Sequence, residues 1–300
     1  MNQFLRNKIV NDFISKYVIH NKYSLYPIFK CQLHNTKFAL LFSLLILPIT
    51  IFLHFIFENN WKLATSLKRN NYIYSFSYKD SEIQFHLHNY QTDLIEKLIF
   101  ESAAFYESDI LNDLSQYLDS SSVVLDVGAN IGNHTIYFSK VIKVFHVYSF
   151  EPIEDTFQKL TKNVSLNNCK NVTLHKCALG AGQLFAEPDN MAFGNSGGMR
   201  IKYSENSKGI IVKPLDDFIF TDKIDLIKID VEGFEEEVLI GGSNRIKTDK
   251  PIIFIEIHKK NYAIVESYLI NQLNYRFEKI FGEDNYLFFP SNVKNLKVLP

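Results

Sequence analysis

The chain has 300 residues, of which 46% are hydrophobic and 22% are charged, enough to form one large domain or a domain with an attachment. Its formal net charge of −1 and its pI near 6.8 create no global basic field, so the composition argues against a nucleic-acid partner. Its three cysteines form no CxxC pair, which indicates neither a disulfide framework nor a zinc site.

The N-terminal part of the chain carries features of membrane association. Residues 38–57 contain no Asp, Glu, Lys or Arg, and a run of this length is a candidate membrane span. Between Val10 and Val18, apolar residues follow helical spacing with basic residues opposite, as in an amphipathic helix on a membrane surface. Pro48 interrupts the apolar run, so a kinked span and a shallow hairpin are both open. In another interpretation, both segments are soluble helices packed on the main domain.

From residue 71 onward, short apolar runs alternate with stretches of helical spacing. The expected strands are 72–78, 82–88, 123–127, 144–150, 172–179, 223–230, 251–258, 275–281 and 285–290, and the expected helices lie near 109–118, 132–142, 153–164, 238–246 and 260–273. This alternation predicts an α/β fold with a mostly parallel sheet, helices on both faces and a C-terminal hairpin. The chain therefore divides into a membrane-association region, 1–70, and an α/β domain, 71–300. Ligands of such sheets bind at the carboxyl ends of the strands.

The loop after the first buried strand contains two glycines, Gly128 and Gly132. A dinucleotide fingerprint requires G-x-G-x-x-G, but its second and third glycines fall on Asn130 and Asn133. Gly128 permits a sharp turn or a close approach of the backbone to a ligand. Glu151 ends the next strand, where a carboxylate can accept both hydroxyl groups of a ribose. The pattern favours an adenosine ligand other than a dinucleotide.

Six motifs occur in a fixed order along the second domain. They are LDVGANIG, SFEP, NSGG (195–198), LDDF (215–218), IKIDVEGFEEEVLIGG and PIIFIEIH. Together they resemble the FkbM-type family of S-adenosylmethionine-dependent methyltransferases, over roughly residues 93–290. The resemblance implies a class I methyltransferase (Rossmann-like) fold, with a seven-stranded sheet whose last strand is antiparallel. It also implies methylation of a hydroxyl oxygen, often on a sugar or a polyketide.

The resemblance also implies how S-adenosyl-L-methionine is held. The loop after the first strand surrounds its methionine part, the carboxylate after the second strand holds its ribose, and the end of the third strand lies near its adenine. The implied cofactor-binding residues are Asp126, Gly128, Asn130, Gly132, Asn133, Glu151, Cys177 and Ala178.

Polar residues at the ends of the fourth and fifth strands are candidates for the acceptor side. Lys228 and Asp230 share one strand face, and so do Glu256 and His258. If the strands are neighbours, as the resemblance implies, the four groups converge, and buried charges must be paired. One interpretation is a structural Lys228–Glu256 ion pair. Another is proton removal from the acceptor hydroxyl, with Asp230 or His258 as the base. With Glu232, the acids and His258 could also bind Mg²⁺, so the metal requirement stays open.

Two further segments have local interpretations. Residues 191–199 are rich in small residues, which suits either a mobile loop that closes on the acceptor or an ordinary turn. Asp216 and Asp217 could cap a local turn or helix.

The leading hypothesis is a membrane-associated O-methyltransferase that acts on a hydroxyl of a sugar, glycolipid or polyketide-like acceptor. The alternatives are an NAD-dependent oxidoreductase on the same type of sheet and a non-catalytic, membrane-tethered binding protein. The methyl donor is made in the cytosol, and a glycan on the sequon Asn133-His134-Thr135 would block the cofactor loop. Both observations predict a catalytic domain that faces the cytosol. Because basic residues lie on both flanks of residues 38–57, we expect this segment to enter the membrane without carrying the domain across it.

Overall fold

The computed structural model describes residue 67 and residues 70–189 and 200–292. The described residues from Asn70 onward belong to one compact unit. Among the residues described, no helix is both long and apolar enough to cross a membrane. The predicted amphipathic helix, the predicted membrane segment 38–57 and the predicted loop 191–199 lie outside the described residues and stay predictions.

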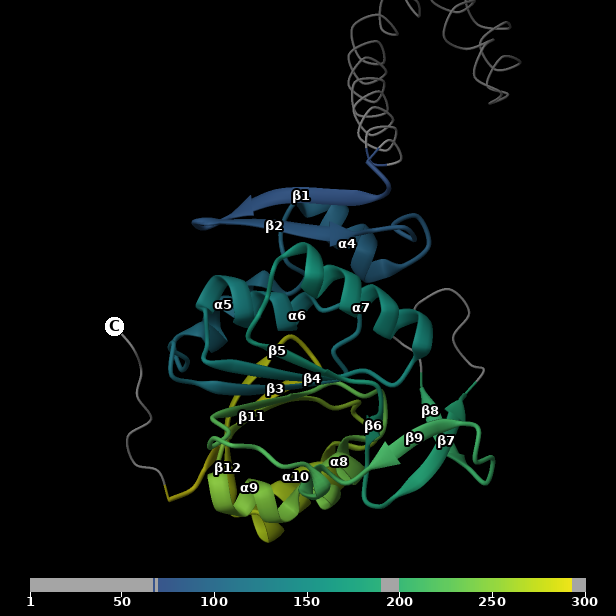
Figure 1. Ribbon diagram of the computed structural model, residues 1–300. Helices are drawn as coiled ribbons and strands as arrows, with labels where there is room; N and C mark the ends of the chain where they lie inside the picture. The colour runs from purple at the N-terminus through teal and green to yellow at the C-terminus, as the bar shows by residue number, and fades with distance from the viewer. Residues whose placement is uncertain (1–66, 68–69, 190–199, 293–300) are drawn as a thin grey trace, which may run out of the picture. The chain divides into compact units, whose positions relative to one another are not determined.

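A seven-stranded sheet with the order β12-β13-β11-β10-β3-β4-β5 forms the centre of this unit (Figure 1). Its strands are β3 (Val123–Val127), β4 (His146–Phe150), β5 (Val172–His175), β10 (Leu226–Ile229), β11 (Ile252–Glu256), β12 (Tyr275–Phe281) and β13 (Asn285–Pro290). The five strands from β11 to β5 are parallel, whereas β13 is antiparallel to both β11 and β12. This arrangement confirms the class I methyltransferase-like fold that the sequence motifs imply.

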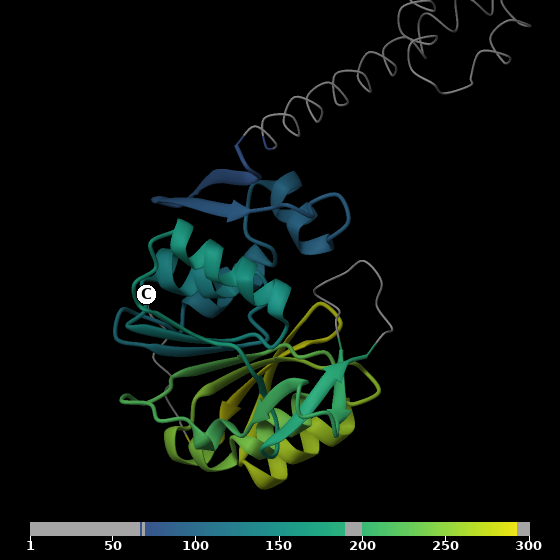
Figure 2. The ribbon, with the colours of Figure 1, turned by 45° about the vertical axis from the view of Figure 1, so that its right-hand side comes forward.

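Helices cover both faces of the sheet, as the α/β alternation predicts. Helices α5 (Ser108–Ser115), α6 (Asn133–Ile136) and α7 (Glu154–Leu166) lie on one face, and α8 (Glu235–Gly241), α9 (Ser243–Asp249) and α10 (Tyr262–Ser267) lie on the other (Figures 1 and 2). Every residue of β3 is buried, because a central parallel strand is covered from both sides. Two predicted helices continue as π-helical turns, η2 (Tyr137–Ile142) and η5 (Tyr268–Gln272).

The predicted N-terminal hairpin is present as β1 (Ile73–Tyr78) and β2 (Ser81–His86), followed by a helix, α4 (Leu94–Ser102). An isolated two-stranded ribbon is marginal in water, and this one is attached to α7 by asparagine side chains. Asn167 Oδ1 accepts from Gln84 N at 2.9 Å, and Asn163 Oδ1 accepts from His86 N at 2.7 Å. The backbone groups along the outer edge of β2 are thereby hydrogen-bonded to the main unit.

A second, four-stranded sheet with the order β6-β9-β7-β8 was not expected from the sequence. Its strands are β6 (Ala178–Leu179), β7 (Leu184–Pro188), β8 (Ile201–Ser204) and β9 (Ile210–Lys213). The prediction of a single strand over 172–179 is wrong. The chain leaves the main sheet after His175, and Ala178 and Leu179 instead pair with β9.

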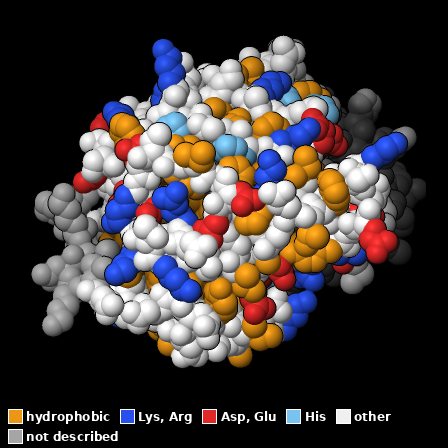
Figure 3. All heavy atoms as spheres, turned by 60° about the horizontal axis from the view of Figure 1, so that its bottom comes forward, with side chains coloured by type: hydrophobic (Ala, Val, Ile, Leu, Met, Phe, Trp, Pro, Cys, Tyr) orange, Lys and Arg blue, Asp and Glu red, His pale blue; other side chains and the backbone are white. Residues whose placement is uncertain are grey.

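The single helix predicted through Val238 and Ile246 is also wrong, because the chain divides at Gly242 into α8 and α9. Asp216 accepts hydrogen bonds from the backbone N–H groups of Asn244 and Arg245 at 3.0 and 2.8 Å. Asp216 therefore binds the first turn of α9, a helix distant in the sequence, rather than the local turn or helix that was expected. On the face that carries these helices, basic side chains are interspersed with acidic and hydrophobic ones (Figure 3).

Candidate active site

A pocket lies at the carboxyl ends of β3, β4 and β10, next to the small sheet. Six of the residues predicted to bind the cofactor or act in catalysis line this pocket: Gly128, Asn130, Glu151, Cys177, Ala178 and Asp230. Glu232 and Ile201 contribute to the same lining. The pocket therefore occupies the place where ligands bind to doubly wound sheets.

Gly128 allows the loop after β3 to cross the end of β10. Its φ is +76°, and a Cβ atom at this position would lie 1.7 Å from the carbonyl oxygen of Asp230. Only glycine fits such a contact in a left-handed conformation. The sequence left open whether the close approach involves a ligand or only a turn. The structure shows an approach to the protein's own backbone, at a residue that also lines the pocket.

Glu151 is almost completely buried and is held by two backbone donors. Its carboxylate accepts hydrogen bonds from Asn130 N at 3.0 Å and from Ile153 N at 2.9 Å. Burial raises the pKa of Glu151 to about 7, although both hydrogen bonds act in the opposite direction. The neighbouring Asn130 Oδ1 is a buried acceptor without a hydrogen-bond partner among the described residues. Two oriented acceptors, one on each residue, thus lie at the pocket.

Three residues predicted to bind the cofactor lie outside the pocket lining. They pack against or hydrogen-bond neighbouring segments instead. A Cβ atom on Gly132 would lie 2.8 Å from Leu160 Cδ1, so this glycine permits close packing of α6 on α7. Asn133 is buried, and its side chain bonds both Tyr106 N and Tyr106 O at 2.9 Å. The carboxylate of Asp126 is fully buried and accepts from Thr135 Oγ1 at 2.6 Å. Contact of these residues with the cofactor stays a prediction.

Lys228 forms the centre of a buried charge cluster. Its Nζ lies 3.3 Å from Asp126 Oδ1 and 3.4 Å from Asp230 Oδ2, and it donates to the carbonyl oxygen of Gly128 at 2.7 Å. The prediction that Lys228 pairs with Glu256 is therefore wrong, because its partners are Asp126 and Asp230. In the sheet register Lys228 lies opposite Asp126 on β3 and opposite Phe254, not Glu256, on β11. Lys228 links the end of β10 to the loop that follows β3.

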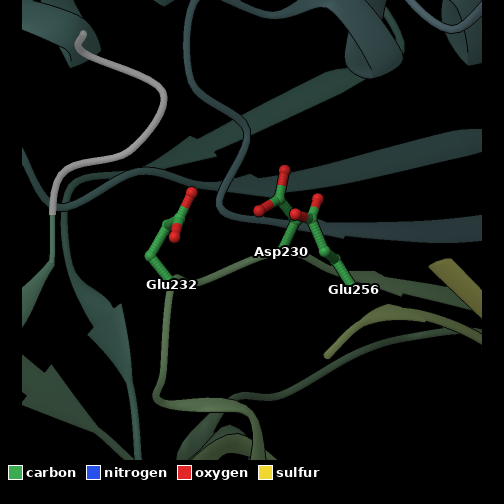
Figure 4. A group of neighbouring side chains, drawn as sticks. All are labelled: Asp230, Glu232 and Glu256. Atoms are coloured by element: carbon green, nitrogen blue, oxygen red, sulfur yellow. The ribbon is translucent and has the colours of Figure 1, made fainter. Parts of the chain in front are cut away.

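Three carboxyl groups converge beside this cluster. Oxygen atoms of Asp230, Glu232 and Glu256 lie within 4.8 Å of one another, with Asp230 and Glu256 side by side (Figure 4). Burial and the negative charges of Asp230, Glu107 and Glu232 together raise the pKa of Glu256 to about 8, although the charge of Lys228 acts in the opposite direction. Oxygen ligands suit Mg²⁺, but carboxyl groups in proximity do not by themselves define a metal site, and we assign none.

His258 lies at the outer side of the carboxyl groups. Its Nε2 is 3.0 Å from Glu232 Oε2 and 3.2 Å from Arg200 Nη2. One ring nitrogen can donate to Glu232 or accept from Arg200, but not both at once. Glu232 has a φ of +53°, an uncommon value for a residue other than glycine. The turn after β10 is thus held in a strained conformation, a feature that clusters at functional sites.

The sequence interpretation missed two residues at this site, Tyr106 and Glu107. Glu107 Oε2 lies 3.4 Å from His134 Nε2, and Tyr106 interacts electrostatically with Glu107, Glu256 and Asp230. Burial tends to raise the pKa of Glu107, but the hydrogen bond and charge of His134 and the charge of Lys228 bring it below its usual value. Both residues come just before a predicted helix rather than at a strand end, so no motif pointed to them.

Residues 126–277 match the model of the methyltransferase FkbM domain. Two curated relatives are similar over about half of this chain. The hexuronic acid methyltransferase AglP of Haloferax volcanii is 31% identical over 153 residues, which cover 51% of this chain and 62% of the relative. Methyltransferase 1 of Beauveria bassiana is 27% identical over 175 residues, which cover 50% of this chain and 67% of the relative. The chain thus spans less than two thirds of the archaeal enzyme's length.

A solved structure of an FkbM methyltransferase from Methylobacillus flagellatus KT is also similar to this chain. The two share 23% sequence identity with a TM-score of 0.43, over 57% of this chain and 44% of the solved one.

Proposed function

Because the chain belongs to the FkbM methyltransferase family, we propose that it transfers a methyl group from S-adenosyl-L-methionine to a hydroxyl group of a sugar. The observation that carries the proposal is that one pocket is lined both by Glu151 and Asn130 and by Asp230 and Glu232. The first pair provides acceptors for an adenosine, and the second pair provides carboxylates at the place where an acceptor hydroxyl would lose its proton.

On the donor side, the residues are suited to S-adenosylmethionine. Glu151 is fixed by two backbone N–H groups, so its remaining lone pairs can accept from both ribose hydroxyls. Cys177 and Ala178, where the chain enters the small sheet, provide an apolar wall that suits an adenine ring. When bound, the cofactor supplies an activated methyl group on a sulfonium, which is transferred as a C–O bond forms and the C–S bond breaks.

On the acceptor side, a base has to remove the hydroxyl proton, because an aliphatic hydroxyl is a weak nucleophile. With its pKa raised to about 8, Glu256 is mostly protonated at neutral pH and acts there as a hydrogen-bond donor. This leaves the two predicted bases, Asp230 and His258. Asp230 lines the pocket and His258 does not. We therefore assign the role of base to Asp230 and regard His258 as the second candidate for that role.

A sugar acceptor is supported by the name of one relative, the hexuronic acid methyltransferase AglP. Family membership decides against the NAD-dependent oxidoreductase that the sheet type left open. The test is incubation with methyl-labelled S-adenosylmethionine and a panel of sugars, glycolipids and polyketides, followed by mass spectrometry. Methyl transfer to a sugar hydroxyl is the expected result. Cofactor binding without transfer to any acceptor would favour the non-catalytic binding protein.

Substitution of Glu151 tests the donor side without an acceptor. We expect Glu151→Gln to weaken S-adenosylmethionine binding about 10- to 100-fold, because a charged acceptor for the ribose is lost. Isothermal titration calorimetry measures this change. Glu154→Gln is the matched control, since Glu154 is exposed and contacts Lys176 and Gln158. Equal affinities in wild type and Glu151→Gln would contradict the assignment of the ribose.

The affinity for S-adenosylmethionine should also depend on pH through Glu151. A ribose that donates to the carboxylate binds the deprotonated form, so binding lowers a pKa that is about 7 in the free protein. We expect the affinity to fall below pH 7, by up to about tenfold for each pH unit. Titrations between pH 5.5 and 7.5 measure this dependence. The Glu151→Gln variant should show a flatter profile, and a wild-type profile equally flat would contradict the prediction.

We propose that the catalytic domain faces the cytosol and that residues 38–57 associate it with a membrane. The buried position of Asn133 supports this orientation, because its amide nitrogen donates to Tyr106 O. A glycan on that nitrogen would prevent the contact, so the folded domain is incompatible with use of the sequon in a glycosylating compartment. Protease treatment of sealed vesicles tests the proposal. A fully protected C-terminal domain would refute it.

A further inference from the structure

Carboxyl groups outnumber cations at the ends of β3, β10 and β11. Besides Asp230, Glu232 and Glu256, they include Asp126 on β3 and Glu107, which precedes α5. The basic side chains nearest to them are Lys228 and Arg200, together with the imidazoles of His134, 3.4 Å from Glu107, and of His258, 3.0 Å from Glu232. Four of the five carboxyl groups lie inside the family-matched residues 126–277, and Glu107 lies outside them.

Glu107 is fixed in place by several elements. Its backbone has a left-handed φ of +57°, and the preceding residue, Tyr106, is hydrogen-bonded through both its N–H and its carbonyl to Asn133. Its carboxylate lies 3.4 Å from His134 Nε2 and accepts from Asn285 Nδ2 at 3.4 Å. Only 15% of the side chain is exposed. A charge held this firmly acts on its surroundings without the cost of reorganisation.

The negative charge at the strand ends is not fully compensated. Lys228 is shared between Asp126 and Asp230, and Arg200 and His258 lie on the side of Glu232. Burial and the neighbouring carboxylates keep Glu256 protonated at neutral pH, so it adds no charge. The other four carboxyl groups face two permanent cations, Lys228 and Arg200. A negative field therefore remains beside the pocket, and Asp230 and Glu232 belong to the pocket lining itself. Glu151 and the open Asn130 acceptor mark a ligand site there independently of these carboxyl groups.

We propose that this field, with Glu107 as the contribution from outside the family domain, selects the sulfonium cation of S-adenosylmethionine over the neutral thioether of S-adenosylhomocysteine. In the reaction the acceptor oxygen bonds to the methyl carbon, and the electron pair of the broken C–S bond stays on sulfur, which becomes a neutral thioether. The proton of the acceptor hydroxyl passes to the base. The product has thus lost the charge that the carboxylates attract. The field favours binding of the donor and release of the product. This inference rests on the proposed assignment of the pocket to the donor.

The test compares the dissociation constants of S-adenosylmethionine and S-adenosylhomocysteine by calorimetry at low ionic strength. For Glu107→Gln we expect donor affinity to fall about five- to tenfold and product affinity to change less than about twofold. Glu107→Asp keeps the charge and should retain most of the wild-type ratio. Glu101→Gln is the matched control, because Glu101 is exposed on α4 and pairs with Lys97.

Wild type alone provides a second readout that does not depend on the folding of any variant. Its preference for the donor should decrease as salt is raised, because salt screens the field. An unchanged preference over the salt range, or an equal loss of donor and product affinity in Glu107→Gln, would overturn the inference. Binding of Mg²⁺ from MgCl₂ alone at these carboxylates would also overturn the inference, because the metal ion would neutralise their negative charge. Absence of donor binding by wild type would instead overturn the proposed function together with the inference.

Discussion

Replacing Lys228 with methionine is expected to lower the free energy of unfolding by about 3–5 kcal/mol, because removal of one partner leaves a buried charge uncompensated. The side chain of Lys228 is 3% exposed and that of Asp126 is 0% exposed. Burial on its own lowers the pKa of Lys228, but Asp230 and Asp126 raise it above its usual value, so the ammonium is charged. The carbonyl of Gly128 would also lose its donor. Urea denaturation followed by circular dichroism measures the effect.

Lys259→Met is the matched control, because Lys259 is exposed and pairs with Glu283. We expect it to change stability by less than about 1 kcal/mol. The double variant Asp126→Asn/Lys228→Met should recover part of the loss, since neither buried charge remains. A loss below about 1 kcal/mol in Lys228→Met would show that the cluster is solvated, contrary to its burial.

Replacing Asp230 with asparagine is expected to lower kcat about 10²- to 10⁴-fold, which is the usual contribution of a general base. The asparagine keeps the size of the side chain but does not take the hydroxyl proton. Asp230 lines the pocket and lies 3.4 Å from Lys228. Because Asp230 also contributes charge, the affinity for S-adenosylmethionine should fall as well, but by less than about tenfold. Initial rates with the sugar acceptor from the screen, combined with calorimetry, separate the two effects.

Asp222→Asn is the control for this substitution, since Asp222 is exposed and contacts Thr221. If Asp230→Asn keeps kcat within about tenfold of wild type, Asp230 is not the base. His258→Gln then decides whether the second candidate carries that role. A large loss in His258→Gln with a small loss in Asp230→Asn would reverse our assignment.

Much of the central sheet could be predicted from the sequence because its parallel strands are short, mainly apolar runs. The prediction of β3 over Val123–Val127 and of the final hairpin over Tyr275–Pro290 agrees with the structure to the residue. The small sheet was not predicted, because its short strands give no clear pattern in the sequence. Its strands have only two to five residues, three of the four contain exposed residues, and their partners lie in other segments of the chain. Helix α4 did carry a local signal, since Asp93 caps it by accepting from Glu96 N.

The site was predicted where a strand end supplied a residue and missed where tertiary structure supplied it. Glu151 and Asp230 directly follow strands, Asn130 lies in the loop after β3, and all three line the pocket. The partner of Lys228 was predicted wrongly because β10 has two neighbours, and the register places Asp126 across from it on β3. Glu107 is held at the site by contacts that no local pattern encodes, among them the hydrogen bond between Asn133 and the preceding residue over 27 positions of sequence.

The residues that match the family model do not include all the strands of the central sheet. The family-matched region begins inside β3 and ends inside β12, at residues 126 and 277. Strand β13 follows it in the chain but lies between β11 and β12 in the sheet. Without β13 those two strands would be separated by two strand spacings, roughly 10 Å, too far to hydrogen-bond. The family-matched segment therefore lacks one strand of its own central sheet, and residues outside it complete the sheet.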